Sequence, residues 1–567
     1  MSKVIVFAIP VFLLLIAVEF AWGYARGRNT FRLSDAINSM SLGMLSQVSA
    51  VFTRLLRVGI YSAVYGAVAL FANDAFWTSG YGWIIALLFY DLCYYWQHRA
   101  GHESAVFWAA HVVHHQSQDY NLSTALRQTS SGALLGWIFY LPMAVAGVPP
   151  LVFGIVALID LLYQFWVHTE HVRKLGWFDR VFCSPSNHRV HHAVNHRYLD
   201  RNYGGILIVW DRMFGSFKEE DERCIYGTRS PLNSWDPVWA NLEVYWTLLK
   251  DSWRTRSWAD KVRVWFKSPG WRPADLQAAD PKPAFDIEKF KLYDPALTPG
   301  MTRFGAAQFV LLLLAVVGFL WYGDDMPIKD SAIWFVTLLT ALWTLGAALQ
   351  GRLGMLEALL IEAAAIATAS SALELLDLHR LFKPLAMVLA FLCVWQRARA
   401  GGGLTRFQQL LLAAILASLA GDVFLMFAGY FIPGLVSFLV AHLCYIALFK
   451  QGVAWFPSRS ALVMTLAFGL LMLALLWSGL PAALKGPVTA YVLVIALMAA
   501  QAVGRAISQR DASALAVAIG ACVFMLSDSL LAINRFLEPL PLASLWVLSS
   551  YYVAQILIIR NAQPVRL

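Results

Sequence analysis

Residues 98–115 read HRAGHESAVFWAAHVVHH, an HxxxH group followed by an HxxHH group. The chain continues with HxxH at residues 168–171 and a second HxxHH at residues 188–192, so that eleven of its 13 histidines lie between positions 98 and 196. On a helix, residues three or four positions apart share one face. Each group therefore presents two or three imidazoles in one direction. Since the first group directly continues an apolar run at residues 82–97, the pattern predicts a histidine-rich site at the ends of apolar helices.

This concentration of imidazoles indicates bound metal, because imidazole is a good ligand for iron, zinc and copper. One zinc ion needs about four ligands. Nine or more histidines exceed that need and favour two ions. Two irons beside a membrane, without a cysteine ligand, indicate oxygen activation. A role in helix capping or headgroup binding is the alternative for any single histidine, but it accounts poorly for two HxxHH groups together with HxxxH.

The composition is that of a polytopic membrane protein. Of the 567 residues, 59% are hydrophobic and 14% are charged, against roughly 25% charged in a soluble domain. A soluble enzyme, a disordered chain and a secreted disulfide scaffold are excluded. The net charge of +9 indicates loops that face anionic lipid, and no separate basic patch predicts nucleic-acid binding. The six cysteines form no CxxC pair.

The apolar segments predict an all-α fold in which many helices cross the membrane. In the first part of the chain we expect crossings at 4–22, 41–71 (interrupted by Arg54 and Arg57) and 82–97, and a helical hairpin from 131–146 and 149–167. Ten further segments approach the ~20-residue spanning length. They lie near 306–322, 332–350, 355–373, 384–397, 406–428, 432–449, 461–480, 487–504, 513–531 and 541–559.

Residues 172–305 contain no convincing span and are expected to form a cap at the membrane surface. If the basic loop at 26–32 is cytoplasmic, residues 98–127 and the cap fall on the cytoplasmic side too. We therefore expect an N-terminal helical bundle with a cytoplasmic, histidine-rich cap, and a C-terminal multi-span bundle. The expected domains are residues 1–305 (a di-iron domain with its cap), 306–375 (additional helices) and 376–567 (a second membrane domain).

The HxxxH, HxxHH and later HxxHH groups resemble the membrane fatty acid hydroxylase/sterol desaturase superfamily. Longer stretches are similar to its alkylglycerol monooxygenase branch, and the likeness covers about residues 1–375. These stretches are DYNLSTALRQ at 119–128, YQFWVHTE at 163–170, PSNHRVHH at 185–192, Asn202-Tyr203 and IVWDRMFG at 208–215.

The resemblance implies an integral membrane oxidoreductase that holds two iron ions, uses tetrahydrobiopterin and O2, and cleaves the ether bond of alkylglycerol lipids. Hydroxylation beside the ether oxygen would give a hemiacetal that collapses to a fatty aldehyde and a glycerol. The implied metal ligands are His98, His102, His111, His114, His115, His168, His188, His191 and His192. His171 and Asn187 depart from the pattern. No pterin-binding residue is assigned. Trp166, Tyr198, Tyr203 and Trp210 could stack a pterin ring, but such residues are more often interfacial anchors.

Carboxylates often orient the imidazoles that bind a metal. The carboxylates nearest to the histidine groups in the sequence are therefore candidates for this role, with helix capping or an interfacial ion pair as the alternative. They are Asp91, Glu103, Asp119, Glu170 and Asp211.

The C-terminal half carries acids inside apolar helices, which are expensive there and indicate a functional site. The motifs Lys383-Pro384, Ser418-Leu-Ala-Gly-Asp422, His442-Leu-Cys-Tyr445 and Ser527-Asp528 resemble the lysoplasmalogenase family over roughly 377–560. The resemblance implies hydrolysis of the vinyl ether bond of lysoplasmalogens, again releasing an aldehyde. We expect Asp422 and Asp528 to be the catalytic acid/base pair. The alternative is a structural polar cluster around Lys383.

Two other functions fit the same sequence. The di-iron centre could belong to a sterol, fatty-acyl or carotenoid hydroxylase or desaturase, although residues 121–127 favour the ether-cleaving branch. The C-terminal half could be a non-catalytic or transport-type membrane domain. The absence of a paired internal repeat counts against a transporter.

Overall fold

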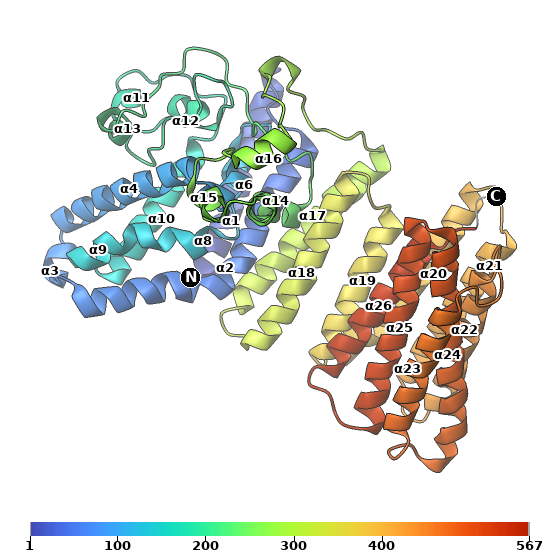
Figure 1. The fold of residues 1–567 in the computed structure, drawn as a ribbon. Coiled ribbons are helices and arrows are strands. Elements are labelled where there is room, and N and C mark those ends of the chain that lie inside the picture. Colours follow the sequence, from blue (N-terminus) through green and yellow to red (C-terminus); the bar gives the residue numbers. More distant parts are fainter. Residues whose placement is uncertain (1, 565–567) are drawn as a thin grey trace. The chain divides into compact units, whose positions relative to one another are not determined.

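The structure, a computed structural model, describes residues 2–564. It is helical throughout, and the described residues form no strand beyond two isolated β-bridges, which confirms the predicted fold class. Contacts divide the chain into two compact units (Figure 1). The first runs to Pro327 and includes Leu345–Arg352, and the second holds Ile328–Thr344 and the chain from Leu353 onward. The domain boundaries expected from the sequence remain predictions.

Eleven helices in the described part of the chain are long and apolar enough to cross a membrane. The first lies in α1 (Ser2–Ala25), and the other ten confirm the ten segments predicted beyond residue 305. These ten are α17 (Pro299–Tyr322), α18 (Ile328–Leu349), α19 (Met355–Ala372), α20 (Leu376–Ala400), α21 (Arg406–Leu425), α22 (Phe431–Phe449), α23 (Arg459–Leu476), α24 (Ala482–Gln509), α25 (Ala512–Phe536) and α26 (Ala543–Asn561).

The other expected crossings are helical but fall outside these eleven. α2 (Leu33–Val68) is 36 residues long, and Val58–Val68 is a shorter apolar stretch within it. α4 (Gly80–Glu103) is long enough but too polar, and α10 (Pro150–Trp166) has only 17 residues. The first arm of the expected hairpin is broken. It consists of α8 (Gly132–Leu135), the 3-10 helix η1 (Gly136–Tyr140) and α9 (Leu141–Ala146).

Aromatic packing holds α2, α4, η1 and α10 together and fixes the helix that carries the first histidine group. Tyr61 of α2 stacks on Phe153 of α10 with ring centroids 4.1 Å apart, and Tyr90 of α4 stacks on Tyr140 of η1 at 4.7 Å. All four side chains belong to one core cluster with buried Met143 and Val156. The C-terminal end of α4, with His98 and His102, is thereby held beside the other histidine groups.

Short helices and loops make up the rest of the first unit. The turn after α4 holds α5 (Ala105–Ala109), α6 (Val112–His115) and α7 (Leu122–Ala125), and α3 (Asp74–Trp77) precedes α4. The cap contains α11 (Phe178–Val181), α12 (Pro185–His192), α13 (Val209–Met213), α14 (Pro237–Arg254), α15 (Trp258–Phe266), α16 (Ala274–Ala279) and η2 (Ile287–Lys289). Ser184 caps α12, because its hydroxyl oxygen accepts a hydrogen bond from the backbone N–H of Asn187.

The second unit is a bundle in which successive helices pack as neighbours. The tightest pairs are α19 with α20, α21 with α22, and α25 with α26. Their interface is one core of leucine, alanine and aromatic side chains, including Ala390, Ile415 and Phe524. Polar residues that face into this apolar core need a partner, since no water is available to them there.

Candidate functional site

The structure brings all nine predicted histidine ligands together in two groups. Within each group, the nitrogen atoms that could bind a metal lie within 4.8 Å of one another. The segments that supply them are the end of α4, the turn holding α6, the residues after α10, and α12. The first group is His98, His102, His111, His115 and His191, and the second is His114, His168, His188 and His192.

The distances inside each group fit a metal ion. In the first group the Nε2 atom of His111 is 3.1 Å from the Nε2 atoms of both His98 and His115. Two ligands on adjacent corners around one ion at about 2.1 Å are about 3.0 Å apart. The Nε2 atoms of His102 and His191 are buried without any hydrogen-bond partner. Since buried polar atoms are rarely unpaired, these nitrogens fit a bound ion.

The second group has the same geometry. The Nε2 atom of His168 is 3.2 Å from that of His114 and 3.1 Å from that of His188. The Nε2 atom of His192 lies 3.2 Å from that of His188. The two groups adjoin, because His115 and His192 stack with ring centroids 4.3 Å apart. The donor set therefore fits two neighbouring ions.

Backbone carbonyl groups orient four of these rings. The Nδ1 atoms of His98 and His114 donate to the carbonyl oxygens of Tyr203 (2.8 Å) and Arg127 (2.9 Å). The same contact joins His168 to Gln164 at 2.8 Å and His191 to Arg201 at 3.1 Å. A proton fixed on Nδ1 leaves the lone pair on Nε2, which faces the group. These partners could not be predicted from the sequence, since every residue type has a carbonyl group.

Burial keeps these imidazoles neutral. It lowers the pKa of His114 to about 4 and holds the pKa of His111, His188 and His192 well below the ordinary value of 6.5. Neighbouring imidazoles lower the pKa of these three rings further, because a second positive charge would repel the first. Neutral imidazole is the form that binds a metal.

Two of the five candidate carboxylates support the site indirectly. Asp211 accepts hydrogen bonds from the backbone N–H groups of Tyr203 and Gly204, both at 2.7 Å. Asp91 accepts from the N–H groups of Ile206 (2.7 Å) and Leu207 (3.0 Å). Both acids therefore fix the loop whose Tyr203 carbonyl oxygen orients His98.

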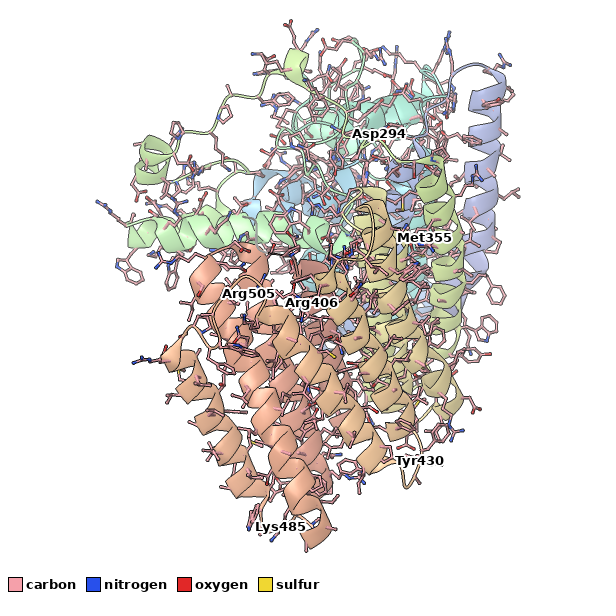
Figure 2. All side chains as sticks on the ribbon, turned by 90° about the vertical axis from the view of Figure 1, so that its right-hand side faces the viewer. Asp294, Met355, Arg406, Tyr430, Lys485 and Arg505 are labelled. Carbon is pink, nitrogen blue, oxygen red and sulfur yellow. The ribbon has the colours of Figure 1, made fainter. Side chains whose placement is uncertain are left out.

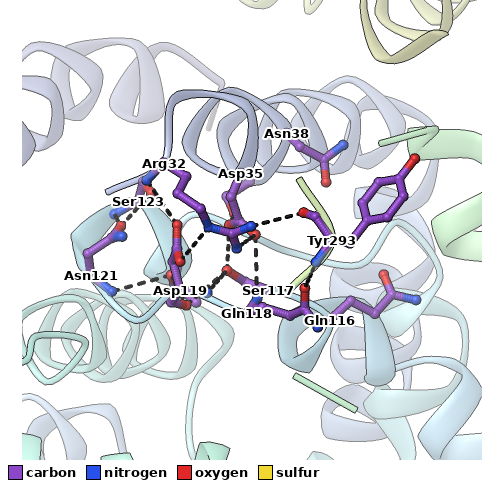
Figure 3. Close-up of polar contacts among 12 residues, drawn as sticks. Arg32, Asp35, Asn38, Gln116, Ser117, Gln118, Asp119, Asn121, Ser123 and Tyr293 are labelled. Atoms are coloured by element: carbon purple, nitrogen blue, oxygen red, sulfur yellow. Dashed lines mark hydrogen bonds and ion pairs between the residues drawn. The ribbon is translucent and has the colours of Figure 1, made fainter. Parts of the chain in front are cut away.

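The other three candidates pair elsewhere. Glu103 forms an ion pair with Arg99 at 2.9 Å, and Glu170 accepts a hydrogen bond from Tyr226. The carboxylate of Asp119 accepts two hydrogen bonds from Arg32, one from the backbone N–H and one from the guanidinium Nε, each at 2.9 Å (Figure 3). Burial, then the charge of Asp35, raises the pKa of Asp119 to about 6. Figure 3 shows that this network joins the start of α2 to residues 116–123 and to Tyr293. The network thereby anchors the chain that follows the first HxxHH group.

The residues outside the ligand set have other surroundings, except Tyr203, whose ring borders the first group. His196 is exposed, and His171 lies beside Gly23 of α1. Asn187 donates to the carbonyl oxygens of Asp179 and Phe182, which is a structural role. Tyr203 is buried with its ring centroid 5.5 Å from that of His102.

A second candidate site lies within the second unit. Asp422 and Asp528 both line a cavity of about 360 Å³. The Lys383 ammonium is 3.4 Å from Asp422, which also accepts a 2.6 Å hydrogen bond from Tyr551. The ion pair between Lys383 and Asp422, which a purely structural polar cluster would contain, is therefore present, and both residues line the cavity.

Asp528 has different partners. It accepts a hydrogen bond from the hydroxyl group of Tyr491, whose oxygen is 2.9 Å from the Nε2 atom of His442. His442 is fully buried and its Nε2 atom is 3.6 Å from Asp528. Tyr445, in the same motif as His442, donates instead to Gln555. The contribution of Tyr491 was missed from the sequence, because only the packing of α22, α24 and α25 brings these three side chains together.

Comparisons with known proteins agree with this arrangement. The fatty acid hydroxylase family matches residues 83–216, and the YhhN family matches residues 378–562. No solved structure matches the chain. The fold and the histidine groups thus define a membrane-bound oxygenase of the fatty acid hydroxylase class, with a second membrane domain attached.

Three relatives identify the two parts more closely. Alkylglycerol monooxygenase of Danio rerio is 35% identical over 68% of this chain and 84% of its own length, and that of Homo sapiens is 39% identical over 47% and 59%. The human lysoplasmalogenase TMEM86B is 34% identical over 32% of this chain and 75% of its own length. The chain therefore belongs to the alkylglycerol monooxygenase family, and its C-terminal part to the lysoplasmalogenase-like YhhN family.

Proposed function

We propose that the N-terminal part is a di-iron monooxygenase that cleaves the ether bond of alkylglycerol lipids, with the nine histidines as iron ligands. The convergence of all nine imidazoles into two adjoining groups is the observation that carries the proposal. The proposal also includes tetrahydrobiopterin as electron donor, which the family resemblance implies. It places the histidine face on the cytoplasmic side, because the loop at 26–32 is basic.

When bound, two irons would activate O2 for hydroxylation of the carbon beside the ether oxygen, and the resulting hemiacetal would collapse to a fatty aldehyde and a glycerol. The chain's own part is to hold neutral imidazoles in place and to exclude water. Burial of His114 and His188 serves both purposes. The carbonyl oxygens of Tyr203 and Arg127 fix the rings of His98 and His114, so that little reorganisation is needed when metal binds.

The test is a pair of matched variants of the full-length protein. His114→Ala removes a ligand of the second group, and His196→Ala removes an exposed imidazole outside both groups. We expect His114→Ala to lose iron and aldehyde release from an alkylglycerol, and His196→Ala to keep both. Full activity and full iron content in His114→Ala would exclude the proposed centre.

We propose further that the cavity of the second unit hydrolyses the vinyl ether bond of a lysoplasmalogen. Asp528 would protonate the outer alkene carbon, water would add to the oxocarbenium carbon, and Asp422 would accept the proton of that water. The hemiacetal then releases a fatty aldehyde. The Lys383 ammonium lies 3.4 Å from the carboxylate of Asp422, the proposed base, while Tyr491 and His442 can return a proton to Asp528.

Arg535 is suited to bind the phosphate of such a lipid. It lines the same cavity, seven residues after Asp528 on α25, so both lie on one helix face about 10 Å apart along the axis. Its guanidinium lies over the ring of Phe431 at 4.1 Å, and no carboxylate pairs with it among the described residues. Arginine is the side chain best matched to a phosphate group.

The hydrolase proposal is tested independently of the oxygenase. Asp528→Asn in the full-length protein is expected to abolish vinyl ether hydrolysis and leave ether oxidation intact. Asp377→Asn, which changes a fully exposed carboxylate outside the cavity, is the matched control. Unchanged hydrolysis in Asp528→Asn would refute the assignment of this acid.

A further inference from the structure

α14 and α15 expose a continuous apolar stripe on the first unit. Along α14 the exposed residues recur at intervals of three and four, which places them on one helix face. Trp253 is 84% exposed and Trp246 49%. The full stripe is Trp239, Leu242, Trp246, Leu249 and Trp253 on α14, with Trp258, Val262 and Phe266 on α15. A face this large and apolar marks a surface that another phase or molecule covers.

The N-terminal end of α14 packs against the end of a membrane-spanning helix. Gly346 lies three residues before the end of α18, and a Cβ atom there would collide with the carbonyl oxygen of Trp235 and meet Pro237 at 3.1 Å. The N-terminus of α14 is therefore packed where the span of α18 ends. Figure 2 shows the green α14 running across the direction of α17, a membrane-spanning helix of the same unit.

Cations flank the stripe. Lys250, Arg254, Arg256 and Lys267 are exposed, and none forms a close ion pair among the described residues, although the charge of Lys250 acts on Glu243 of the same helix. By contrast, Arg272 is paired with Asp251 at 3.1 Å. Tryptophan and unpaired basic side chains at the level where a span ends are the composition of a helix that lies in the lipid–water interface.

The opposite face of α14 is bound to the chain around the first HxxHH group. The carbonyl oxygen of Ala240 accepts a hydrogen bond from Gln116, the residue after His115, at 3.2 Å. The Asn241 side chain accepts from the backbone N–H of Ser130 at 2.9 Å. A force that fixes α14 at the membrane therefore also fixes the height of the histidine groups above the lipid.

We propose that α14 and α15 form an in-plane membrane anchor whose occupant is the anionic surface of the protein's own bilayer leaflet. The tryptophan stripe enters the boundary between headgroups and acyl chains, and Lys250, Arg254, Arg256 and Lys267 bind anionic headgroups. The anchor holds the histidine groups at a constant depth over the leaflet. This claim depends neither on bound metal nor on the proposed reactions.

Depth is measured with a nitroxide label in the full-length protein in nanodiscs of phosphatidylcholine and phosphatidylserine. Trp253→Cys carries the label on the stripe, and Gln277→Cys carries it on the exposed surface of α16 as a control; the signal from native cysteines is subtracted. Label 253 is expected to collide with O2, which dissolves in lipid, far more than with a water-soluble nickel chelate, and label 277 to do the reverse.

Two results would overturn the anchor. If label 253 is as accessible to the nickel chelate as label 277, the stripe faces water. If it is closed to both reagents, a protein surface or a second copy of the chain covers it.

Headgroup charge is tested with spin-labelled lipids. The wild-type protein is expected to immobilise phosphatidylserine in excess of phosphatidylcholine. Lys250→Gln/Arg254→Gln should reduce that excess, while Arg223→Gln/Lys289→Gln, which removes two exposed cations of the cap outside α14 and α15, should not. An equal effect of the two variants, or none from the first, would contradict headgroup binding by α14.

Discussion

The carbonyl oxygen of Arg127 accepts a 2.9 Å hydrogen bond from Nδ1 of His114. The side chain of the same arginine is buried and turns back to donate from Nε to the carbonyl oxygen of Val113 at 2.7 Å, and from a terminal nitrogen to Asn38 at 2.8 Å. Arg127 thus holds both the ring of His114 and the backbone just before it. It is a positioning residue, since it reaches no atom where metal would bind.

Replacing this guanidinium should weaken the second histidine group. Arg127→Met removes the donor to the Asn38 side chain and the shorter of the two hydrogen bonds to the Val113 carbonyl, which costs about 2 to 4 kcal/mol of folding stability. Iron affinity should fall about 10- to 100-fold because the backbone before His114 loses its anchor at Val113, although the carbonyl group of residue 127 remains. Thermal unfolding and metal analysis measure the two effects. Arg180→Met, on an exposed arginine, is the control, and equal iron affinity in both variants would contradict this role.

Asp211 should act on the first group in the same indirect way. Asp211→Asn keeps the size of the side chain but weakens the hydrogen bonds to Tyr203 and Gly204, at a cost of about 1.5 to 3 kcal/mol. Iron affinity should fall while the substrate KM of fully loaded enzyme stays unchanged. Asp221→Asn, on a half-exposed carboxylate that pairs with Lys218, should change neither quantity. A raised KM with normal iron affinity would show instead that Asp211 acts on the substrate.

The metal-free protein should lose stability in acid. An unfolded histidine takes up a proton near pH 6.5, whereas burial lowers the pKa of His114 to about 4 in the folded chain. Below pH 6.5 the unfolded state therefore binds more protons than the folded state, and stability falls as the pH drops toward 4. For His114 alone the loss is on the order of 3 kcal/mol. Unfolding of apo protein in denaturant at pH 7.5 and pH 5 tests this, and equal stability at both would contradict it.

Tyr491 should matter for vinyl ether hydrolysis alone. Tyr491→Phe keeps the ring but breaks the link between His442 and Asp528, so kcat should fall about 100-fold with little change in KM. Tyr430→Phe, on an exposed ring outside the cavity, is the control. Ether oxidation should be unchanged in both. Normal hydrolysis by Tyr491→Phe would mean that Asp528 is supplied with protons by another route.

Arg535 should select lipids that carry a phosphate group. Arg535→Gln is expected to raise KM for a lysoplasmalogen about 10-fold and to leave the KM for a neutral alkenylglycerol unchanged. Only the lysoplasmalogen carries a phosphate group, which loses its positively charged partner. Arg459→Gln, at an exposed position outside the cavity, is the control. Equal effects of Arg535→Gln on both lipids would place its role in folding or in cavity shape.

Sequence patterns predicted much of this arrangement because two strong signals dominate. Hydropathy located the ten helices from α17 to α26, since each is apolar over nearly a full span. Spacing singled out the histidine-rich segments, and the resemblance to the hydroxylase superfamily implied the nine ligands. The division of the first HxxHH group, with His111 and His115 in one cluster and His114 in the other, was not predicted. The broken arm formed by α8, η1 and α9 could not be seen, because its residues are as apolar as those of an unbroken helix.

The partners of the site residues were less visible. The contacts of His98 and His114 run to backbone carbonyl groups, which carry no residue identity. Asp211 was a candidate from its position, but its attachment to the Tyr203 loop depends on how that loop folds. Tyr491 reaches His442 across 49 positions of sequence, and only the packing of the bundle brings the two together.

X-ray absorption at the iron edge, combined with metal counting on the full-length protein purified from an iron-replete host, tests the central claim most directly. The account predicts about two irons per chain, each surrounded by nitrogen or oxygen atoms at about 2.1 Å with no sulfur neighbour. One iron or fewer after full loading, or sulfur among the nearest atoms, would contradict a pair of ions held by these nine imidazoles.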